Sequence, residues 1–268
     1  MYKQFYGLKE NPFSKGNALG FFEYNAFREA QARINTAIAQ NEISLITGDT
    51  GAGKTTLLRS ILAKMDVSST KCAYVADPSQ KPRAILREIS LQLGTQPPYL
   101  LPDVLANIRN HIHNLANQKI TPIILFDDIQ LAEFKTIEFV RMLSNFDMDA
   151  KNRVAIILSG HHDFRAKLKL SAYQSLNQRI FVRFKMPNLS MEETLAYIQF
   201  QTKQAGAKRD VFADEALQLI YNITKGLPRK INLICSTALM VGAAENITII
   251  GPSVIKRIID DNDLDGAV

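Results

Sequence analysis

Short runs of apolar, mostly branched residues alternate with longer amphipathic stretches over the first two thirds of the chain. Such runs, bounded by polar or turn residues, are typical of strands buried in a parallel sheet. The pattern predicts strands at 43–47, 72–76, 121–126, 154–159 and 180–184, with helices from 54 onward and at 81–93, 103–118 and 133–145. This alternation predicts an α/β fold in which helices sandwich a five-stranded parallel sheet.

Beyond residues 186–188 (Met-Pro-Asn) the apolar pattern is helical only. Ser190 and Glu193 have the spacing of a capping box, in which each side chain satisfies an amide at the start of a helix. Helices are predicted at 190–204, 213–223, 228–244 and 252–260, and two of them start with proline, which loses no hydrogen bond there. We therefore expect an α/β domain over residues 1–187 and a small all-α domain over residues 188–268.

The composition is that of an ordinary globular protein. Of 268 residues, 46% are hydrophobic and 22% charged, which excludes a disordered or collagen-like chain. The net charge of +6 is compatible with a polyanionic partner. Cys72 and Cys235 lie in apolar stretches and are expected to be buried, reduced thiols. Since neither a signal peptide nor a window of about 20 apolar residues is found, we expect a cytoplasmic protein without a membrane partner.

The residues between the first strand and the next helix match the phosphate-binding P-loop, G-x-x-x-x-G-K-T. Its glycines let backbone amides face phosphate oxygens, and the helix start adds a favourable dipole. Lys54 is expected to reach the β- and γ-phosphates, and Thr55 to ligate Mg²⁺. The predicted nucleotide-binding residues of this loop are Gly48, Asp49, Thr50, Gly51, Ala52, Gly53, Lys54, Thr55 and Thr56.

Two carboxylates follow the third predicted strand, where a P-loop protein carries its second magnesium-binding element. Asp127 is the predicted Mg²⁺ ligand. Asp128 is predicted to hold and polarise the attacking water, a role that requires a carboxylate within one hydrogen bond of that water. A simple turn at the end of the strand is the alternative.

A serine and four histidines are further candidates for functional sites. Ser159, His161 and His162 follow the fourth strand and should reach the same sheet edge, where one of them is a candidate γ-phosphate sensor. An ordinary polar cluster in a loop is the alternative. His111 and His113 have a metal-like spacing, but their side chains diverge by about 200° on a helix, so we expect no zinc site.

Several motifs together resemble the ExeA-type branch of AAA+ ATPases. They are YGLKENPF at 6–13, FREA at 27–30, the P-loop, DDIQ at 127–130, LNQRI at 176–180 and GLPRKIN at 226–232. Within that branch, NFDMD at 145–149 and AGAK at 205–208 are most similar to short helper ATPases encoded beside DDE transposases, functional relatives of MuB, TniB and TnsC. The resemblance implies an AAA+ domain followed by a helical lid.

The resemblance also implies an ATP hydrolase that uses ATP and Mg²⁺, with Lys54 and Asp128 among its catalytic residues. Arg179 resembles the arginine finger that one subunit offers to its neighbour's γ-phosphate. Arg229 resembles the sensor-2 arginine of the lid, which contacts nucleotide and supports catalysis. Phe13, in the N-terminal segment 1–30, resembles the residue that packs against adenine. An ordinary surface arginine is the alternative for both arginines.

Two basic regions are candidates for contact with double-stranded DNA. By resemblance, Lys81 and Arg83 in the loop after the second strand would face DNA in the oligomer. Residues 164–186 contain no acidic side chain and six cations: Arg165, Lys167, Lys169, Arg179, Arg183 and Lys185. A solvated basic surface is the alternative for both regions.

Two departures from the family pattern bear on the rate of hydrolysis. Asp128 stands where the family usually has Glu, and the missing methylene shortens its reach toward the water. His161 stands where the family usually has Gln. Both changes affect the expected rate of hydrolysis more than nucleotide binding.

The resemblance predicts a homo-oligomer, either a hexameric ring or a helical filament, that assembles on DNA with ATP and recruits or regulates a DDE transposase. An ExeA-like ATPase that assists pilus or secretion-system assembly is the first alternative. The second alternative is an ATP-gated scaffold with negligible hydrolysis, which the short Asp128 side chain favours.

Overall fold

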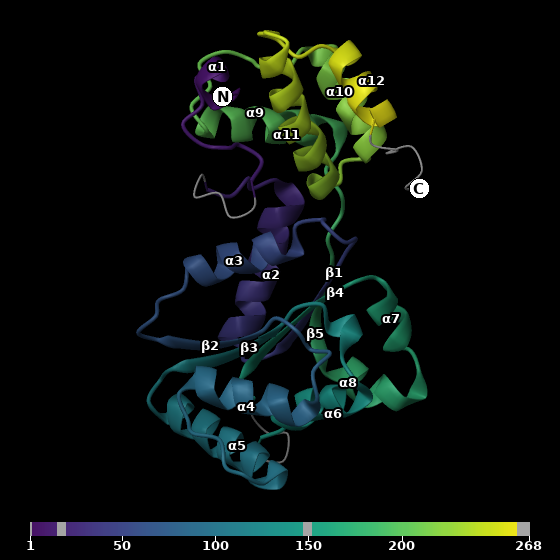
Figure 1. Cartoon of the computed structure of the whole chain (residues 1–268). Coiled ribbons are helices and arrows are strands. Elements are labelled where there is room, and N and C mark those ends of the chain that lie inside the picture. The colour runs from purple at the N-terminus through teal and green to yellow at the C-terminus, as the bar shows by residue number, and fades with distance from the viewer. Residues whose placement is uncertain (1, 15–19, 147–151, 262–268) are drawn as a thin grey trace. The chain divides into compact units, whose positions relative to one another are not determined.

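The computed structural model describes residues 2–14, 20–146 and 152–261. Its contacts divide the chain into two compact units, whose elements are labelled in Figure 1. The sheet unit contains residues 25–50 and 54–186. The helical unit contains the described residues up to Tyr24, the short segment Gly51–Gly53, and the described residues from Pro187 onward.

The sheet unit is built on five parallel strands in the order β2-β3-β4-β1-β5. The strands are β1 (Ile43–Thr47), β2 (Thr70–Val75), β3 (Thr121–Phe126), β4 (Ala155–Gly160) and β5 (Ile180–Lys185). All residues of the central strands β1 and β4 are buried, whereas the edge strand β5 alternates between buried and exposed residues. The predicted fold class is confirmed: β1 and β3 have the predicted bounds, and the ends of the other three strands lie within two residues of the prediction.

Helices cover both faces of this sheet (Figure 1). One face packs against α2 (Asn25–Ala39) and α3 (Lys54–Ala63), and the other against α4 (Pro82–Leu93), α5 (Leu101–Asn117) and α6 (Phe134–Leu143). The short helices α7 (Asp163–Lys167) and α8 (Gln174–Arg179) connect β4 to β5. Helix α2 was not predicted from the sequence, although its buried residues Phe27, Ala30, Ile34 and Ala37 follow the helical repeat.

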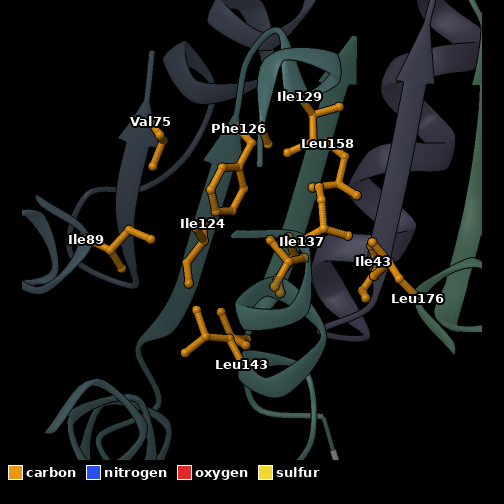
Figure 2. Packing of buried hydrophobic residues seen from close by; sticks show 14 of the residues in the cluster. Ile43, Val75, Ile89, Ile124, Phe126, Ile129, Ile137, Leu143, Leu158 and Leu176 are labelled. Carbon is orange, nitrogen blue, oxygen red and sulfur yellow. The ribbon is translucent and has the colours of Figure 1, made fainter. Parts of the chain in front are cut away.

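The core between the sheet and the helices α4 to α6 explains why these strands are so apolar. Figure 2 shows Ile124 and Phe126 of β3 beside Leu158 of β4, with Ile89 and Ile137 packed against them from the helices. Each of these five side chains is at most 1% exposed. Burial of a side chain of this size contributes about 1.5–3 kcal/mol, so the inner strands tolerate few polar residues.

The helical unit contains α1 (Tyr2–Tyr6), α9 (Met191–Gln204), α10 (Asp214–Thr224), α11 (Pro228–Ala244) and α12 (Pro252–Asp261). The predicted capping box is present at the start of α9, where Ser190 and Glu193 each accept a hydrogen bond from the other residue's amide. No helix among residues 2–14, 20–146 and 152–261 combines the length and the apolar character needed to cross a membrane.

The described residues up to Tyr24 group with the helical unit, whereas residues 25–30 of the predicted N-terminal segment 1–30 belong to the sheet unit. Helix α1 packs against α11, and the Tyr6 hydroxyl donates a hydrogen bond to Ile247 O at 2.8 Å. The Phe13 ring is 5% exposed and meets the Phe212 ring edge-on, with 6.3 Å between centroids. These contacts join residues 241 and 199 positions apart, so local sequence patterns do not reveal them.

Candidate functional site

The P-loop follows β1 and has the backbone conformation that its glycines allow. Gly51 and Gly53 have φ angles of 93° and 94°, in the left-handed region that L-residues avoid. Helix α3 then begins at Lys54. The Gly48 amide donates to Gly160 O of β4 at 3.2 Å, which fixes the start of the loop against the neighbouring strand.

Lys54 points back over the loop. Its side chain is 7% exposed, and Nζ donates hydrogen bonds to Gly48 O and Asp49 O, both at 2.9 Å. A buried ammonium group requires such partners, because an unpaired charge in this position would be costly. The carbonyl oxygens therefore hold Lys54 at the loop that is predicted to surround the phosphates.

Asp127, directly after β3, is held by hydrogen bonds from four other residues. Its carboxylate is 6% exposed and accepts hydrogen bonds from the Thr55 hydroxyl at 2.8 Å, the Ser159 hydroxyl at 2.8 Å, the Asp128 amide at 3.1 Å and the Tyr74 hydroxyl at 3.4 Å. The two predicted Mg²⁺ ligands, Thr55 and Asp127, are therefore in direct contact. The pairing follows from the strand order, since the ends of β3, β4 and β1 lie side by side.

Tyr74 was not predicted as a site residue. It lies on β2, which pairs with β3, and its exposed fraction is 38%. Partial burial, followed by the charge of Asp127 and the hydrogen bond to it, raises the pKa of the Tyr74 hydroxyl. The Gln92 side chain also bonds to both the amide and the carbonyl of Tyr74, at 2.7 and 2.9 Å. The only signal in the sequence is the position of Tyr74 near the end of a strand.

Asp128, the predicted water-polarising residue, is exposed and has a left-handed backbone with φ 48° and ψ 43°. Asp is one of the few residues with a side chain that adopt this region at small cost. Its Oδ1 accepts a hydrogen bond from Gln130 Nε2 at 3.1 Å, and Gln130 Oε1 accepts one from the His161 amide at 2.9 Å. Gln130 belongs to the short 3₁₀ helix η1 (Ile129–Leu131).

The three polar candidates after β4 have different environments. Ser159 is fully buried and faces Asp127. His161 Nδ1 lies 2.9 Å from Asp163 Oδ2, and His162 Nε2 lies 2.9 Å from Asp49 Oδ1 of the P-loop. Of the three, His162 is the one whose side chain is shown in contact with an Asp side chain of the P-loop. The sensor assignment stays a prediction.

Arg229 and Phe13 lie in the helical unit. Arg229 is exposed in the first turn of α11, and its amide donates to Gly51 O at 3.3 Å. A Cβ atom at Gly51 would lie 2.5 Å from Arg229 Cβ, so this position has no room for a side chain. Phe13 is buried against Phe212, and its predicted contact with adenine remains a prediction.

The remaining predicted residues lie in the sheet unit. Arg179 is the last residue of α8 and is half-buried directly before β5. Lys81 is exposed before α4. The Arg83 guanidinium donates a hydrogen bond to Tyr99 O and lies 4.9 Å from the Tyr99 ring centroid. Of the motif at 145–149, residues 147–149 lie outside the described residues.

Comparison with solved structures finds proteins of the same fold. The ADP form of the ORC2 protein from Aeropyrum pernix matches with a TM-score of 0.73 at 16% identity, covering 96% of this chain and 74% of that one. The A. pernix ORC1 protein in complex with DNA matches with a TM-score of 0.69 at 14% identity, covering 95% and 69%. At these identities the likeness shows the fold alone.

Sequence comparison shows the family. Residues 38–168 match the AAA domain family, a range that runs from the last two residues of α2 through α7 and includes the P-loop and Asp127. General secretion pathway protein A from Aeromonas hydrophila is 34% identical over 254 residues, which are 91% of this chain and 45% of that protein. The chain thus spans less than half the length of this relative. On its sequence and fold, the chain is an ExeA-like member of the AAA+ ATPases.

Proposed function

We propose that this chain binds ATP with Mg²⁺ and hydrolyses it, and that its ATP-bound form assembles on DNA. The observation that supports the first part is the contact between the Thr55 hydroxyl and the Asp127 carboxylate, 2.8 Å apart beside the P-loop. Hydroxyl and carboxylate oxygens are ligands that Mg²⁺ prefers, so this pair fits the ion. Bound Mg²⁺ would neutralise negative charge on the phosphate oxygens.

Each residue of the site has a role that its environment supports. Lys54 now donates to two carbonyl oxygens, and phosphate oxygens are stronger acceptors for the same ammonium group. Ser159 and Tyr74 donate hydroxyl hydrogen bonds to Asp127 and hold its carboxylate toward Thr55. Asp128 is exposed and accepts the proton of the attacking water or orients that water. Arg179 acts on a neighbouring subunit's site.

We further propose that the oligomer, a ring or a filament, binds double-stranded DNA and recruits or regulates a DDE transposase. Exposed Lys81, the net charge of +6 and the resemblance of the motifs at 145–149 and 205–208 to transposon helper ATPases support this proposal. The fold likeness to the ORC1 protein solved in complex with DNA agrees with it. Lys81 and Arg83 are both exposed, and the Arg83 guanidinium lies over the Tyr99 ring.

A second candidate function is assistance to secretion or pilus assembly. The 34% identity to general secretion pathway protein A favours this candidate, since it extends over 91% of the chain. The two candidates share the ATPase site and differ in whether DNA is a partner.

Phosphate release measured against protein concentration, with and without duplex DNA, tests these proposals. We expect turnover to rise more than linearly with concentration, because a neighbour's Arg179 completes each site, and to rise further with DNA. Loss of an arginine finger costs about 10³–10⁵ in rate, so Arg179→Ala should abolish turnover and preserve nucleotide binding. Lys54→Ala should abolish nucleotide binding itself.

DNA binding is measured with ATP at increasing salt, since contacts to phosphates release counterions and weaken steeply with ionic strength. Binding that weakens in this way and is reduced in Lys81→Ala supports the DNA-dependent function. Turnover without DNA binding favours secretion or pilus assembly. Negligible turnover that Arg179→Ala leaves unchanged means an ATP-gated scaffold.

A further inference from the structure

Gln130 connects the ends of two strands through a single side-chain amide. Its Nε2 group donates to Asp128 Oδ1 at 3.1 Å, and its Oε1 atom accepts from the His161 amide at 2.9 Å. Asp128 follows β3 and His161 follows β4. An amide is suited to this bridge because it offers a donor and an acceptor on adjacent atoms, whereas a carboxylate offers acceptors only.

The local backbone directs Gln130 into this position. The left-handed conformation of Asp128 turns the chain out of β3, and the Leu131 amide then donates to Asp128 O at 2.9 Å to form η1. This turn brings the side chain of Gln130 back over the residue that starts it. The bridge therefore depends on an uncommon conformation for a residue other than glycine.

Gly160 provides the space that Gln130 occupies. A Cβ atom at Gly160 would lie 2.7 Å from Gln130 Oε1 and 2.9 Å from Ile129 Cγ2, both too close for a real side chain. Gly160 O also accepts the hydrogen bond from the Gly48 amide at 3.2 Å. The end of β4 is thus bonded to the P-loop on one side and to Gln130 on the other.

We propose that Gln130 is a positioning residue that holds the Asp128 carboxylate and tethers it to the end of β4. The tether runs from the P-loop to the carboxylate through the amides of Gly48 and His161 and the side chain of Gln130. A shift of β4 at the P-loop is thereby transmitted to Asp128. This inference rests on the proposed role of Asp128 in hydrolysis.

Two variants separate the two hydrogen bonds of Gln130. Gln130→Glu keeps an acceptor for the His161 amide but removes the donor to Asp128 and adds a like charge beside it. Gln130→Ala removes both bonds. Leu131→Ala is the matched control, because Leu131 lies in the same turn, is 56% exposed and has no predicted role in the site.

Hydrolysis and nucleotide affinity are measured for each variant. General-base assistance increases the rate by about 10²–10⁴-fold. We therefore expect kcat to fall by about 10-fold or more in both Gln130 variants, because Asp128 loses its positioning. The dissociation constant for nucleotide should stay within about twofold, because Gln130 is not predicted to contact nucleotide. Leu131→Ala should match the wild type. Wild-type kcat in Gln130→Glu overturns the proposal.

Amide hydrogen exchange of His161 in the nucleotide-free protein gives a second measurement that does not depend on hydrolysis. Loss of a hydrogen bond worth about 1 kcal/mol should speed this exchange about fivefold in Gln130→Ala, and Gln130→Glu should retain slow exchange. Unchanged exchange in Gln130→Ala overturns the tether even if the wild type hydrolyses no ATP. Absence of wild-type hydrolysis together with fast exchange in Gln130→Ala refutes the proposed ATPase activity and supports the tether.

Discussion

Two buried serines on neighbouring strands should respond in opposite ways to replacement by alanine. Ser159 on β4 and Ser44 on β1 are both fully buried. The Ser159 hydroxyl donates to Asp127 Oδ1 at 2.8 Å, whereas Ser44 Oγ has no hydrogen-bond partner within the described parts of the chain. The pair therefore isolates the contribution of one hydrogen bond to the buried carboxylate.

The expected change in the free energy of unfolding depends on whether each serine hydroxyl has a hydrogen-bond partner. A hydrogen bond to a charged group contributes about 1.5–3 kcal/mol, so Ser159→Ala should lower the free energy of unfolding of the sheet unit by about 2 kcal/mol. Ser44→Ala removes a buried hydroxyl that gives up its hydrogen bonds to water on folding and gains no partner among the described residues. Such a group costs about 1–3 kcal/mol, so this variant should be as stable as the wild type or more stable.

Amide hydrogen exchange of β1 and β4 in the nucleotide-free protein is the appropriate assay, because central-strand amides report the opening of the sheet unit by itself. A loss of 2 kcal/mol corresponds to exchange that is about 30-fold faster in Ser159→Ala. Ser44→Ala should show equal or slower exchange. Equal acceleration in the two variants would refute the reasoning, because the hydrogen bond to Asp127 would then contribute nothing.

Two further predictions concern positions outside the P-loop. Gly226 has φ 73°, and a Cβ atom there would lie 1.9 Å from Leu189 O. Gly226→Ala should therefore lower the free energy of unfolding of the helical unit by more than about 2 kcal/mol. Urea unfolding followed by circular dichroism measures this loss. Gly7→Ala is the control, since Gly7 has φ 68° but a Cβ atom there would lie more than 4 Å from any atom outside its chain neighbours. An equal loss of stability in this control would contradict the steric argument. Burial raises the pKa of the Cys72 thiol from 9.0 to about 11, so its alkylation by iodoacetamide at pH 8 should be about 100-fold slower than in the urea-unfolded chain. Mass spectrometry measures both rates, and a ratio near one would show that the thiol is exposed.

The sequence by itself predicted the features that depend on local patterns. Branched apolar runs predicted all five strands, because such residues gain most from burial in a parallel sheet. The P-loop pattern predicted the turn before α3, because its glycines permit a backbone that other residues avoid. The contact between Thr55 and Asp127 was also predictable, since the carboxyl ends of parallel strands meet at one sheet edge.

Only the tertiary structure decided which polar groups meet around the two aspartates. Ser159 and Tyr74 are 32 and 53 residues from Asp127, and no spacing rule relates them to it. Gln130 reaches the His161 amide because Asp128 has a left-handed backbone and because Gly160, which lacks a side chain, leaves space for it. The sequence shows the glycine, but only the paired strands show that Gln130 lies against it.

The placement of the N-terminal segment was likewise decided by tertiary contacts. Tyr6 and Phe13 gave no periodic signal, and they join the helical unit through a hydrogen bond to Ile247 and a ring contact with Phe212. Hydrophobic periodicity reports which side of an element is buried, but it does not identify the surface that covers that side. That choice depends on shape and hydrogen-bond complementarity between segments that are 199 and 241 residues apart at these two contacts, which form only when the chain has folded.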